Sequence, residues 1–134
     1  PLDVGLRCPL GVGVGGLAIL SALPADTADR MVLDNAPRYD RQPGLGAARL
    51  LRELAASRRR GHARRDSVMV PGVVAIGLPV PYGASTGSLT VACMKDQLDR
   101  RRTERVLQAL ADARERIGAP QPGGDGGARS MSVR

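Results

Sequence analysis

Two uncharged and largely apolar runs, separated by a short turn-forming segment, constrain the fold of this chain more than any other feature. The first run is Val73 to Val80 (VVAIGLPV) and the second is Leu89 to Met94 (LTVACM). Both have the length and composition of buried strands. Pro81 to Gly87 (PYGASTG) has the glycine and proline content of a hairpin turn, so the two runs are predicted to pair antiparallel.

Helical periodicity dominates the rest of the chain. Apolar spacing predicts helices from Gly11 to Leu23, from an Asp26 or Thr27 cap to about Asn35, from Leu45 to Arg60, and from an Asp96 or Asp99 cap to Gly118. Their predicted apolar faces include Met31 beside Ala28 and Val32, and Ile117 in the last helix. Pro37 is expected to end the second helix, with a loop from Arg38 to Gly44.

The order of these elements indicates the fold class. Short strands are also predicted within Leu2 to Leu10 and His62 to Asp66, which gives strand, three helices, strands and a final helix. This order is typical of the α+β class, because a parallel sheet requires strict alternation. Residues 119–134 are rich in glycine and almost free of apolar side chains, so we expect a disordered tail after a single domain of residues 1–118. Because the sequence begins with Pro1 rather than Met, that domain is expected to be N-terminally incomplete.

Composition argues against several classes of protein. No apolar run reaches the ~18 residues that span a bilayer, so no membrane segment is predicted. Cys8 and Cys93 lie far apart in apolar stretches, which favours buried, reduced thiols and a cytoplasmic protein. With His62 as the single histidine, a multi-histidine metal site is excluded, and no cofactor is expected.

The net charge of +7 is concentrated in one segment. Arg41 to Arg65 contains eight arginines and a single acid, Glu53. Such a cluster can bind the phosphates of a nucleic acid. However, the chain has no Phe or Trp and only Tyr39 and Tyr82, whereas single-strand binders stack bases on aromatic side chains. A solvated helix face or a subunit contact is therefore the favoured interpretation.

Two short patterns suggest cofactor binding or catalysis. Gly11 to Gly16 (GVGVGG) matches G-x-G-x-x-G, but a dinucleotide loop requires a β-α-β unit, and here Pro24 and a second helix follow. The segment is expected to pack a helix closely on a sheet, or to offer backbone amides to the carboxylate of a small ligand. Ser67, His62 and Asp66 are neighbours in sequence only, since strand alternation points adjacent side chains apart. The chain is therefore not predicted to be an enzyme.

Four segments in a fixed order resemble one protein family. They are Gly5 to Leu20 (GLRCPLGVGVGGLAIL), Leu51 to Ala63 with its Leu54, Arg58 and Gly61, Pro71 to Val80 (PGVVAIGLPV) and Gly87 to Ala92 (GSLTVA). Over about residues 3–118, their order and spacing resemble the second half of the effector-binding domain of IclR-type transcriptional regulators. The resemblance implies a GAF-like fold, an antiparallel sheet flanked by helices with a small-molecule pocket on one face.

The resemblance also implies partners and a binding site. A small organic acid would be the effector, the chain would form a homodimer or homotetramer, and operator DNA would be bound only through a winged helix-turn-helix that is absent here. The ligand-binding positions carried over by motif are Cys8, Val14, Gly15, Arg65, Val73, Ala75, Ala92 and Met94. Strand alternation places Val73 with Ala75 and Ala92 with Met94. Arg65 is expected either to clamp a carboxylate or to be a surface residue, solvated or paired with Asp66.

This sequence departs from the commonest family pattern at three positions. Gly11 replaces a frequent histidine, Arg65 stands where an acid is common, and Ala92 stands where a serine is common. Two alternatives therefore stay open beside the effector-sensing and oligomerisation portion of a regulator. One is a structural GAF-like domain without a ligand, and the other is a module that binds nucleic acid directly through Arg41–Arg65.

Overall fold

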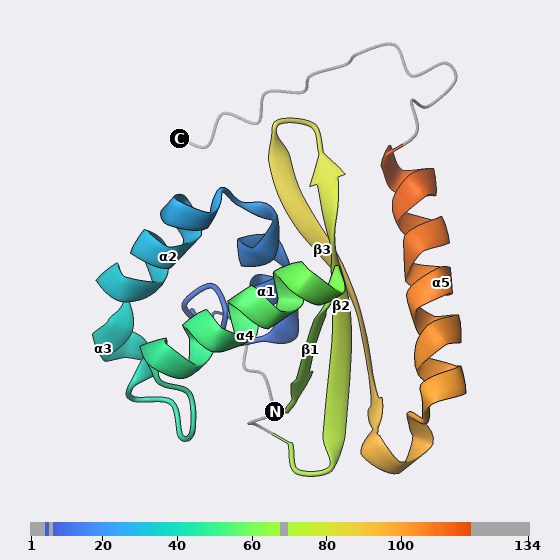
Figure 1. The fold of residues 1–134 in the computed structure, drawn as a ribbon, viewed down its shortest axis with the longest axis horizontal. Helices are drawn as coiled ribbons and strands as arrows, with labels where there is room; N and C mark the ends of the chain where they lie inside the picture. Colours follow the sequence, from blue (N-terminus) through green and yellow to red (C-terminus); the bar gives the residue numbers. More distant parts are fainter. Residues whose placement is uncertain (1–4, 6, 68–69, 119–134) are drawn as a thin grey trace.

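The computed structural model describes residues 5, 7–67 and 70–118, and it has a sheet between two layers of helices (Figure 1). The strands lie in the order β1 (Ala63–Asp66), β2 (Val73–Tyr82) and β3 (Ser85–Met94), all antiparallel. The helices are α1 (Val14–Ala22), α2 (Ala25–Asp34), α3 (Ala36–Tyr39), α4 (Ala47–Arg60), the 3-10 helix η1 (Lys95–Gln97) and α5 (Arg100–Gly118). Helices α1 to α4 lie on one side of the sheet and α5 on the other (Figure 1), which confirms the α+β class.

The β2–β3 hairpin is longer than the sequence predicts. Its pairing runs without interruption from Val73 opposite Met94 to Tyr82 opposite Ser85, so the turn contains two residues rather than seven. The strands continue through the prolines because β1 pairs only with residues 74–77 of β2. Beyond that point, β2 has no neighbouring strand in β1 to which its backbone N–H groups would donate, so Pro79 and Pro81, which lack an N–H, are tolerated there.

Alternation along β2 divides the sheet into two unlike faces. Val74, Ile76 and Leu78 are buried and pack in one cluster with Leu98 and Leu110 on the α5 side. The residues between them face α1, and directly opposed residues of β3 share the same face. The register therefore assigns each residue of the hairpin to one helical layer.

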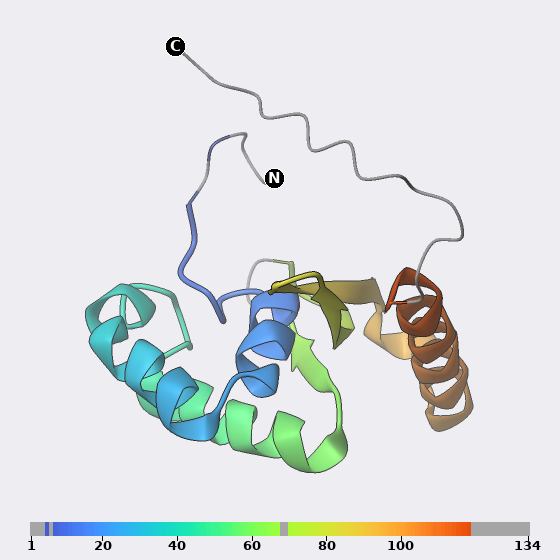
Figure 2. The same cartoon turned by 90° about the horizontal axis from the view of Figure 1, so that it is seen from above.

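Helices α1 to α4 lie together on one side of the sheet (Figure 2), and the larger of the two cores is built mainly from them. The residues of this core are almost fully inaccessible to solvent. Helix α1 contacts α4 as well as the strands β2 and β3. The main apolar members are Leu17, Leu20, Val32, Tyr39, Leu45, Leu50 and Leu54. Helix α4 matches the predicted amphipathic segment, although it begins at Ala47 and leaves Leu45 as a buried residue of the preceding loop.

Several helix boundaries differ from the sequence predictions. Neither Asp26 nor Thr27 caps α2, which begins directly after Pro24. Asp99 rather than Asp96 caps α5, because its Oδ1 accepts the Arg102 N–H at 2.7 Å. Pro37 does not end α2 but lies in the first turn of α3, where a helix needs no N–H from it.

Two predicted apolar positions face solvent, namely Met31 in α2 and Ile117 near the end of α5. Residues 7–9 form no strand, and the rest of the strand predicted at the N-terminus is either a turn or outside the described residues. The predicted tail of residues 119–134 also lies outside them. No described helix combines the length and the apolar character needed to cross a membrane.

Candidate functional site

Four of the predicted ligand-binding residues lie together on the α1 face of the sheet. Val73 is directly opposite Met94, and Ala75 is directly opposite Ala92. All four are partly or largely accessible, whereas the other face of β2 is buried beneath α5. The described structure thus has an apolar and open surface beside the N-terminus of α1, as strand alternation predicts.

A small cavity of about 90 Å³ adjoins this surface. It lies where the loop before α1 meets the ends of β1 and β2. Its lining residues are Val12, Gly13, Val14, Arg65, Asp66, Ser67 and Ala75. The cavity therefore brings together three of the predicted site residues from three different elements, and its volume suits a group of carboxylate size rather than a whole metabolite.

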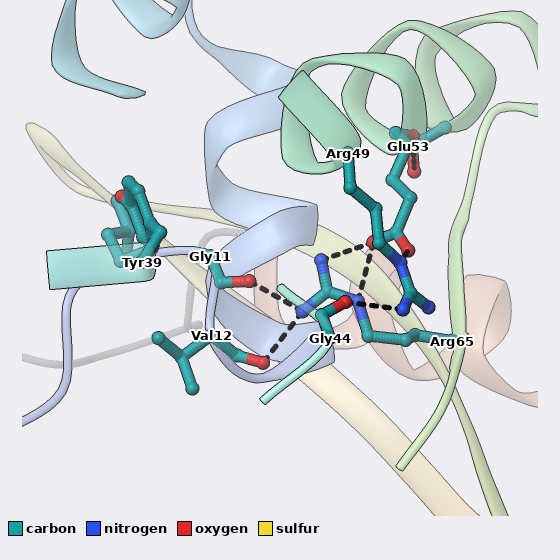
Figure 3. A network of polar contacts seen from close by, with 9 residues as sticks. Gly11, Val12, Tyr39, Gly44, Arg49, Glu53 and Arg65 are labelled. Atoms are coloured by element: carbon teal, nitrogen blue, oxygen red, sulfur yellow. Dashed lines mark hydrogen bonds and ion pairs between the residues drawn. The ribbon is translucent and has the colours of Figure 1, made fainter. Parts of the chain in front are cut away.

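Arg65 occupies the centre of a polar network behind this cavity (Figure 3). Its Nε donates to Glu53 Oε2 at 2.6 Å, and its Nη2 forms an ion pair with the same carboxylate. Its Nη1 donates to the carbonyls of Gly11 and Val12 at 2.6 and 2.7 Å. Arg49 Nε donates to Glu53 Oε1 at 2.9 Å, so a single carboxylate balances two guanidinium groups.

This geometry excludes the surface position that the sequence analysis left open for Arg65. The side chain is 3% exposed and is paired with Glu53, so the pairing with Asp66 and the solvated surface position are both wrong. Asp66 instead accepts from Lys95 Nζ at 2.6 Å. The guanidinium already contacts a carboxylate and two carbonyls, so a direct contact with a ligand would compete with them or use Nη2, a buried nitrogen with no hydrogen-bond partner among the described residues.

The loop before α1 is held from two directions. Arg65 binds its carbonyls at Gly11 and Val12, and Tyr39 Oη donates to the Leu10 carbonyl at 2.6 Å. Burial raises the pKa of Tyr39 above its usual value, against the smaller opposing effect of Arg38, so the phenol stays a donor at neutral pH. These contacts fix the direction in which the first amides of α1 point.

The glycine pattern of this loop serves close packing rather than nucleotide binding. Gly11 has a φ of +104°, a conformation that other residues rarely adopt. A Cβ at Gly16 would lie 2.5 Å from the backbone N of Gly11, so the loop touches α1 directly. At Gly15, a Cβ would lie 2.8 Å from Ser88 Oγ, so this residue sits directly against β3.

Electrostatics at the site follow from burial. Burial lowers the pKa of Arg65 below its ordinary range, while Glu53 opposes this shift. Arginine remains a cation at neutral pH even when it is buried. The N-terminus of α1 contributes partial positive charge to the same region, and the Asp66 carboxylate, which also lines the cavity, opposes it.

The remaining predicted residues lie farther out. Cys8 is exposed in the loop before α1 and Cys93 is half-buried, so both are free thiols but neither is buried as expected. Cys93 lies on the α5 face, opposite Val74. Among the sequence neighbours that are not predicted to act together in catalysis, Asp66 is paired with Lys95, and Ser67 Oγ accepts the Val70 N–H at 3.0 Å. In the described part of the chain, no three His, Cys, Asp or Glu side chains gather in a way that could hold a metal ion.

Sequence reasoning missed Glu53 and Tyr39. Glu53 is the one acid within Arg41–Arg65, and a buried arginine requires an acid, so the charge pattern contained a usable signal. Tyr39 carried no such signal, because its partner is a backbone carbonyl 29 residues away.

The arginines of Arg41–Arg65 do not form one continuous basic surface. Arg65 is buried, Arg49 is paired with Glu53, and Arg58 is paired with Asp29.

Comparison with known proteins identifies the architecture. No protein-family model matches the sequence, and no curated protein matches it either. Among solved structures, the repressor BlcR of Agobacterium tumefaciens superimposes with a TM-score of 0.68 at 21% identity, over 87% of this chain and 49% of BlcR. The C-terminal domain of the E. coli transcriptional regulator KdgR gives 0.70 at 20% identity, over 84% of this chain and 71% of that domain.

The effector domain of the transcriptional regulator IclR from Acinetobacter sp. ADP1 is also similar. Its TM-score is 0.68 at 16% identity, over 90% of this chain and 72% of that domain. The chain thus spans about half the length of BlcR and most of the two isolated domains. This chain has the fold of the effector domain of IclR-type transcriptional regulators.

Proposed function

We propose that this chain is the effector-sensing and oligomerisation portion of an IclR-type transcriptional regulator, and that it binds a small organic acid. The observation that carries the proposal is the open apolar face of Val73, Ala75, Ala92 and Met94 beside a small cavity at the N-terminus of α1. The similar structures are regulators, two of them solved as an isolated C-terminal or effector domain. No catalysis and no cofactor are part of the proposal.

The ligand would lie with its carboxylate in the cavity and its apolar part on the sheet. The backbone N–H groups of Val14 and Gly15, in the first turn of α1, have no C=O partner within the helix, and they lie at the positive end of the helix dipole. A cavity of about 90 Å³ accepts the acid group alone, so the remainder of the ligand would cover Ala75 and Ala92.

Arg65 is proposed to act as a positioning residue. Its contacts with Gly11 and Val12 fix the loop that forms one wall of the cavity. Its charge adds to the attraction for an anion at short range. Because Glu53 and Arg49 belong to the same network, movement of the loop would be transmitted to α4.

Regulation would follow from a population shift. A ligand that binds one arrangement of the domain more tightly than another biases their equilibrium. In a homodimer or homotetramer, that bias would change the spacing of DNA-binding heads, and operator DNA would be contacted only through a winged helix-turn-helix outside this chain. The protein would act in the cytoplasm.

Calorimetric titration with a panel of aliphatic and aromatic acids tests the proposal. We expect at least one acid to bind with micromolar to millimolar affinity, and its neutral amide to bind at least tenfold more weakly. Ala75→Phe should abolish binding by filling the site. Val91→Phe is the matched control, because Val91 lies on the opposite face of the neighbouring strand and should leave the affinity unchanged.

Each alternative function corresponds to a different outcome of this experiment. If no acid binds a folded chain, the chain is a structural module. If duplex DNA binds at physiological salt and Ala75→Phe has no effect, the direct nucleic-acid function gains support. Ion pairs with Glu53 and Asp29 already occupy three arginines of Arg41–Arg65, which argues against direct binding of DNA.

A further inference from the structure

The charges around the small cavity do not balance. Glu53 is the one carboxylate that contacts Arg65 and Arg49 among the described residues, so a single negative charge faces two guanidinium groups. Asp66 lines the cavity as well, but its side chain is 56% exposed and is paired with Lys95 Nζ at 2.6 Å. Two carboxylates thus face three cations, and this group of side chains is one negative charge short of neutrality.

The incompletely paired nitrogen of this group is Nη2 of Arg65. The Nε and Nη1 atoms of Arg65 donate to Glu53 and to the carbonyls of Gly11 and Val12 (Figure 3). Its Nη2 is buried and forms an ion pair with Glu53, yet it has no hydrogen-bond partner in the part of the chain that the structure describes. That nitrogen carries two N–H groups, and a buried N–H without an acceptor is costly. Arg65 therefore has donor capacity that its protein contacts do not use.

The N-terminus of α1 borders the same cavity. Gly13 is the N-cap residue and Val14 is the first residue of the helix, and both line the cavity together with Arg65. Helix α1 has nine residues, so its first backbone N–H groups carry partial positive charge and have no acceptor within the helix. A buried guanidinium and a helix N-terminus, two independent features, thus border one small cavity.

We infer that this cavity binds one monoanionic carboxylate, whose oxygens accept from Arg65 Nη2 and from the first amides of α1. The volume of about 90 Å³ suits a carboxylate, either as the acid group of an organic ligand or as a free anion such as acetate. The anion supplies the missing negative charge, and neither Glu53 nor the loop carbonyls need to be displaced. A dianion is opposed by Asp66, which lines the same cavity.

This inference rests on the proposed function for the place of the acid group, and it adds a direct contact between the ligand and Arg65. In the proposed function, Arg65 only positions the loop before α1. Because an acid is common at this position in the family pattern, the contact is a property of this chain rather than of the resemblance.

An NMR titration of the full chain with acetate tests the direct contact. We expect the guanidinium carbon of Arg65 and the amides of Val14 and Gly15 to shift with one common dissociation constant in the millimolar range, because so small a ligand makes few contacts. The guanidinium carbon of Arg49 should shift much less, since Arg49 does not line the cavity. The absence of a saturable shift at Arg65 would overturn the inference and leave the cavity to water.

Matched lysine variants give the second test. Arg65→Lys keeps a positive charge opposite Glu53 but removes Nη2, so it should weaken acetate binding at least tenfold. Arg49→Lys is the control, because it also removes a guanidinium from Glu53 but should change the affinity less than twofold. Equal weakening by both variants, or no weakening by Arg65→Lys, would remove the inference. Circular dichroism verifies folding, and if Arg65→Lys does not fold, the Arg65 signal of the parent chain decides alone.

Methylphosphonate, at a pH where it is a dianion, tests the charge of the ligand. We expect it to bind the parent chain at least fivefold more weakly than acetate, and Asp66→Asn should reduce this difference, because the variant removes the opposing carboxylate. Equal binding of the two anions by the parent chain would contradict the preference for a monoanion.

Longer acids separate the failure of this inference from the failure of the proposed function. If acetate binds through Arg65 but no longer acid binds more tightly, the carboxylate site stands and the apolar face has no role in binding. If a longer acid binds while the Arg65 signal and the affinity of Arg65→Lys stay unchanged, the inference falls and the proposed function stands.

Discussion

The two helical layers that cover the sheet are stabilised in different ways. The α1–α4 layer buries most of its apolar side chains completely and contains the network of Arg65, Glu53 and Arg49. Helix α5 is 19 residues long, yet Leu110 is its only buried residue. Its own local contacts support it instead, namely the Asp99 cap and pairs such as Arg100 with Glu104.

The α1–α4 layer is therefore the more rigid of the two, and α5 is the more loosely packed. Tight packing around α1 fixes the loop and the helix N-terminus that border the candidate site. The thin contact of α5 leaves Val91 and the groove beside β3 accessible. The candidate site thus lies beside the tightly packed layer, and an accessible groove lies beside the loosely packed one.

The largest expected effect comes from truncating one core leucine in each layer. Leu54→Ala should destabilise the chain by about 4 kcal/mol and Leu110→Ala by about 2 kcal/mol, because a fully enclosed site leaves a larger cavity. Urea denaturation followed by circular dichroism measures both. Equal losses would show that the two layers are packed equally well.

The next largest effect concerns the buried ion pair. Glu53→Gln should cost about 3 kcal/mol, because it leaves the Arg65 guanidinium buried without a counter-charge. The double variant Glu53→Gln/Arg65→Met should be less destabilised than the sum of its single variants, as expected for coupled residues. Strict additivity in the same denaturation experiment would contradict the network.

A smaller effect is expected at Tyr39. Tyr39→Phe removes the hydrogen bond to the Leu10 carbonyl and should cost about 1 kcal/mol. Tyr82→Phe serves as the control, since Tyr82 is 73% exposed, and should be neutral. If both variants unfold at the same denaturant concentration as the parent, the loop is not held through Tyr39.

The smallest effect is a pH dependence from His62. Burial, together with the nearby positive charge of Arg60, lowers the pKa of His62 in the folded chain below its ordinary value of 6.5. The unfolded chain therefore binds the proton more readily, so stability is highest above pH 6.5 and falls as the pH drops below it. Thermal melts at pH 7.5 and 5.5 should differ less for His62→Gln than for the parent chain.

The elements with a long and uniform apolar pattern could be predicted from the sequence. Helix α4 follows helical spacing, and the two hairpin strands contain uncharged apolar runs of strand length. The boundaries that failed depend on tertiary context. Pro81 reads as a turn residue in the sequence, yet it lies in β2, at a point that β1 does not reach.

The site was predictable only in part. Alternation placed Val73, Ala75, Ala92 and Met94 on one face, and the register confirms this placement. The partner of Arg65 could not be assigned by proximity, since Asp66 is adjacent in sequence whereas Glu53 lies across the structure on α4. Whether the eight predicted residues bind a ligand stays a prediction.

Methyl NMR of the alanine-, valine- and methionine-labelled chain during titration with a small organic acid tests the central claim most directly. The methyl groups of Ala75, Ala92 and Met94 lie on the α1 face, and those of Val74 and Val91 lie on the α5 face. We expect saturable shifts for the first set of methyl groups, with much smaller shifts for the second. Shifts confined to Val74 and Val91, or no saturable shift with any acid, would contradict it.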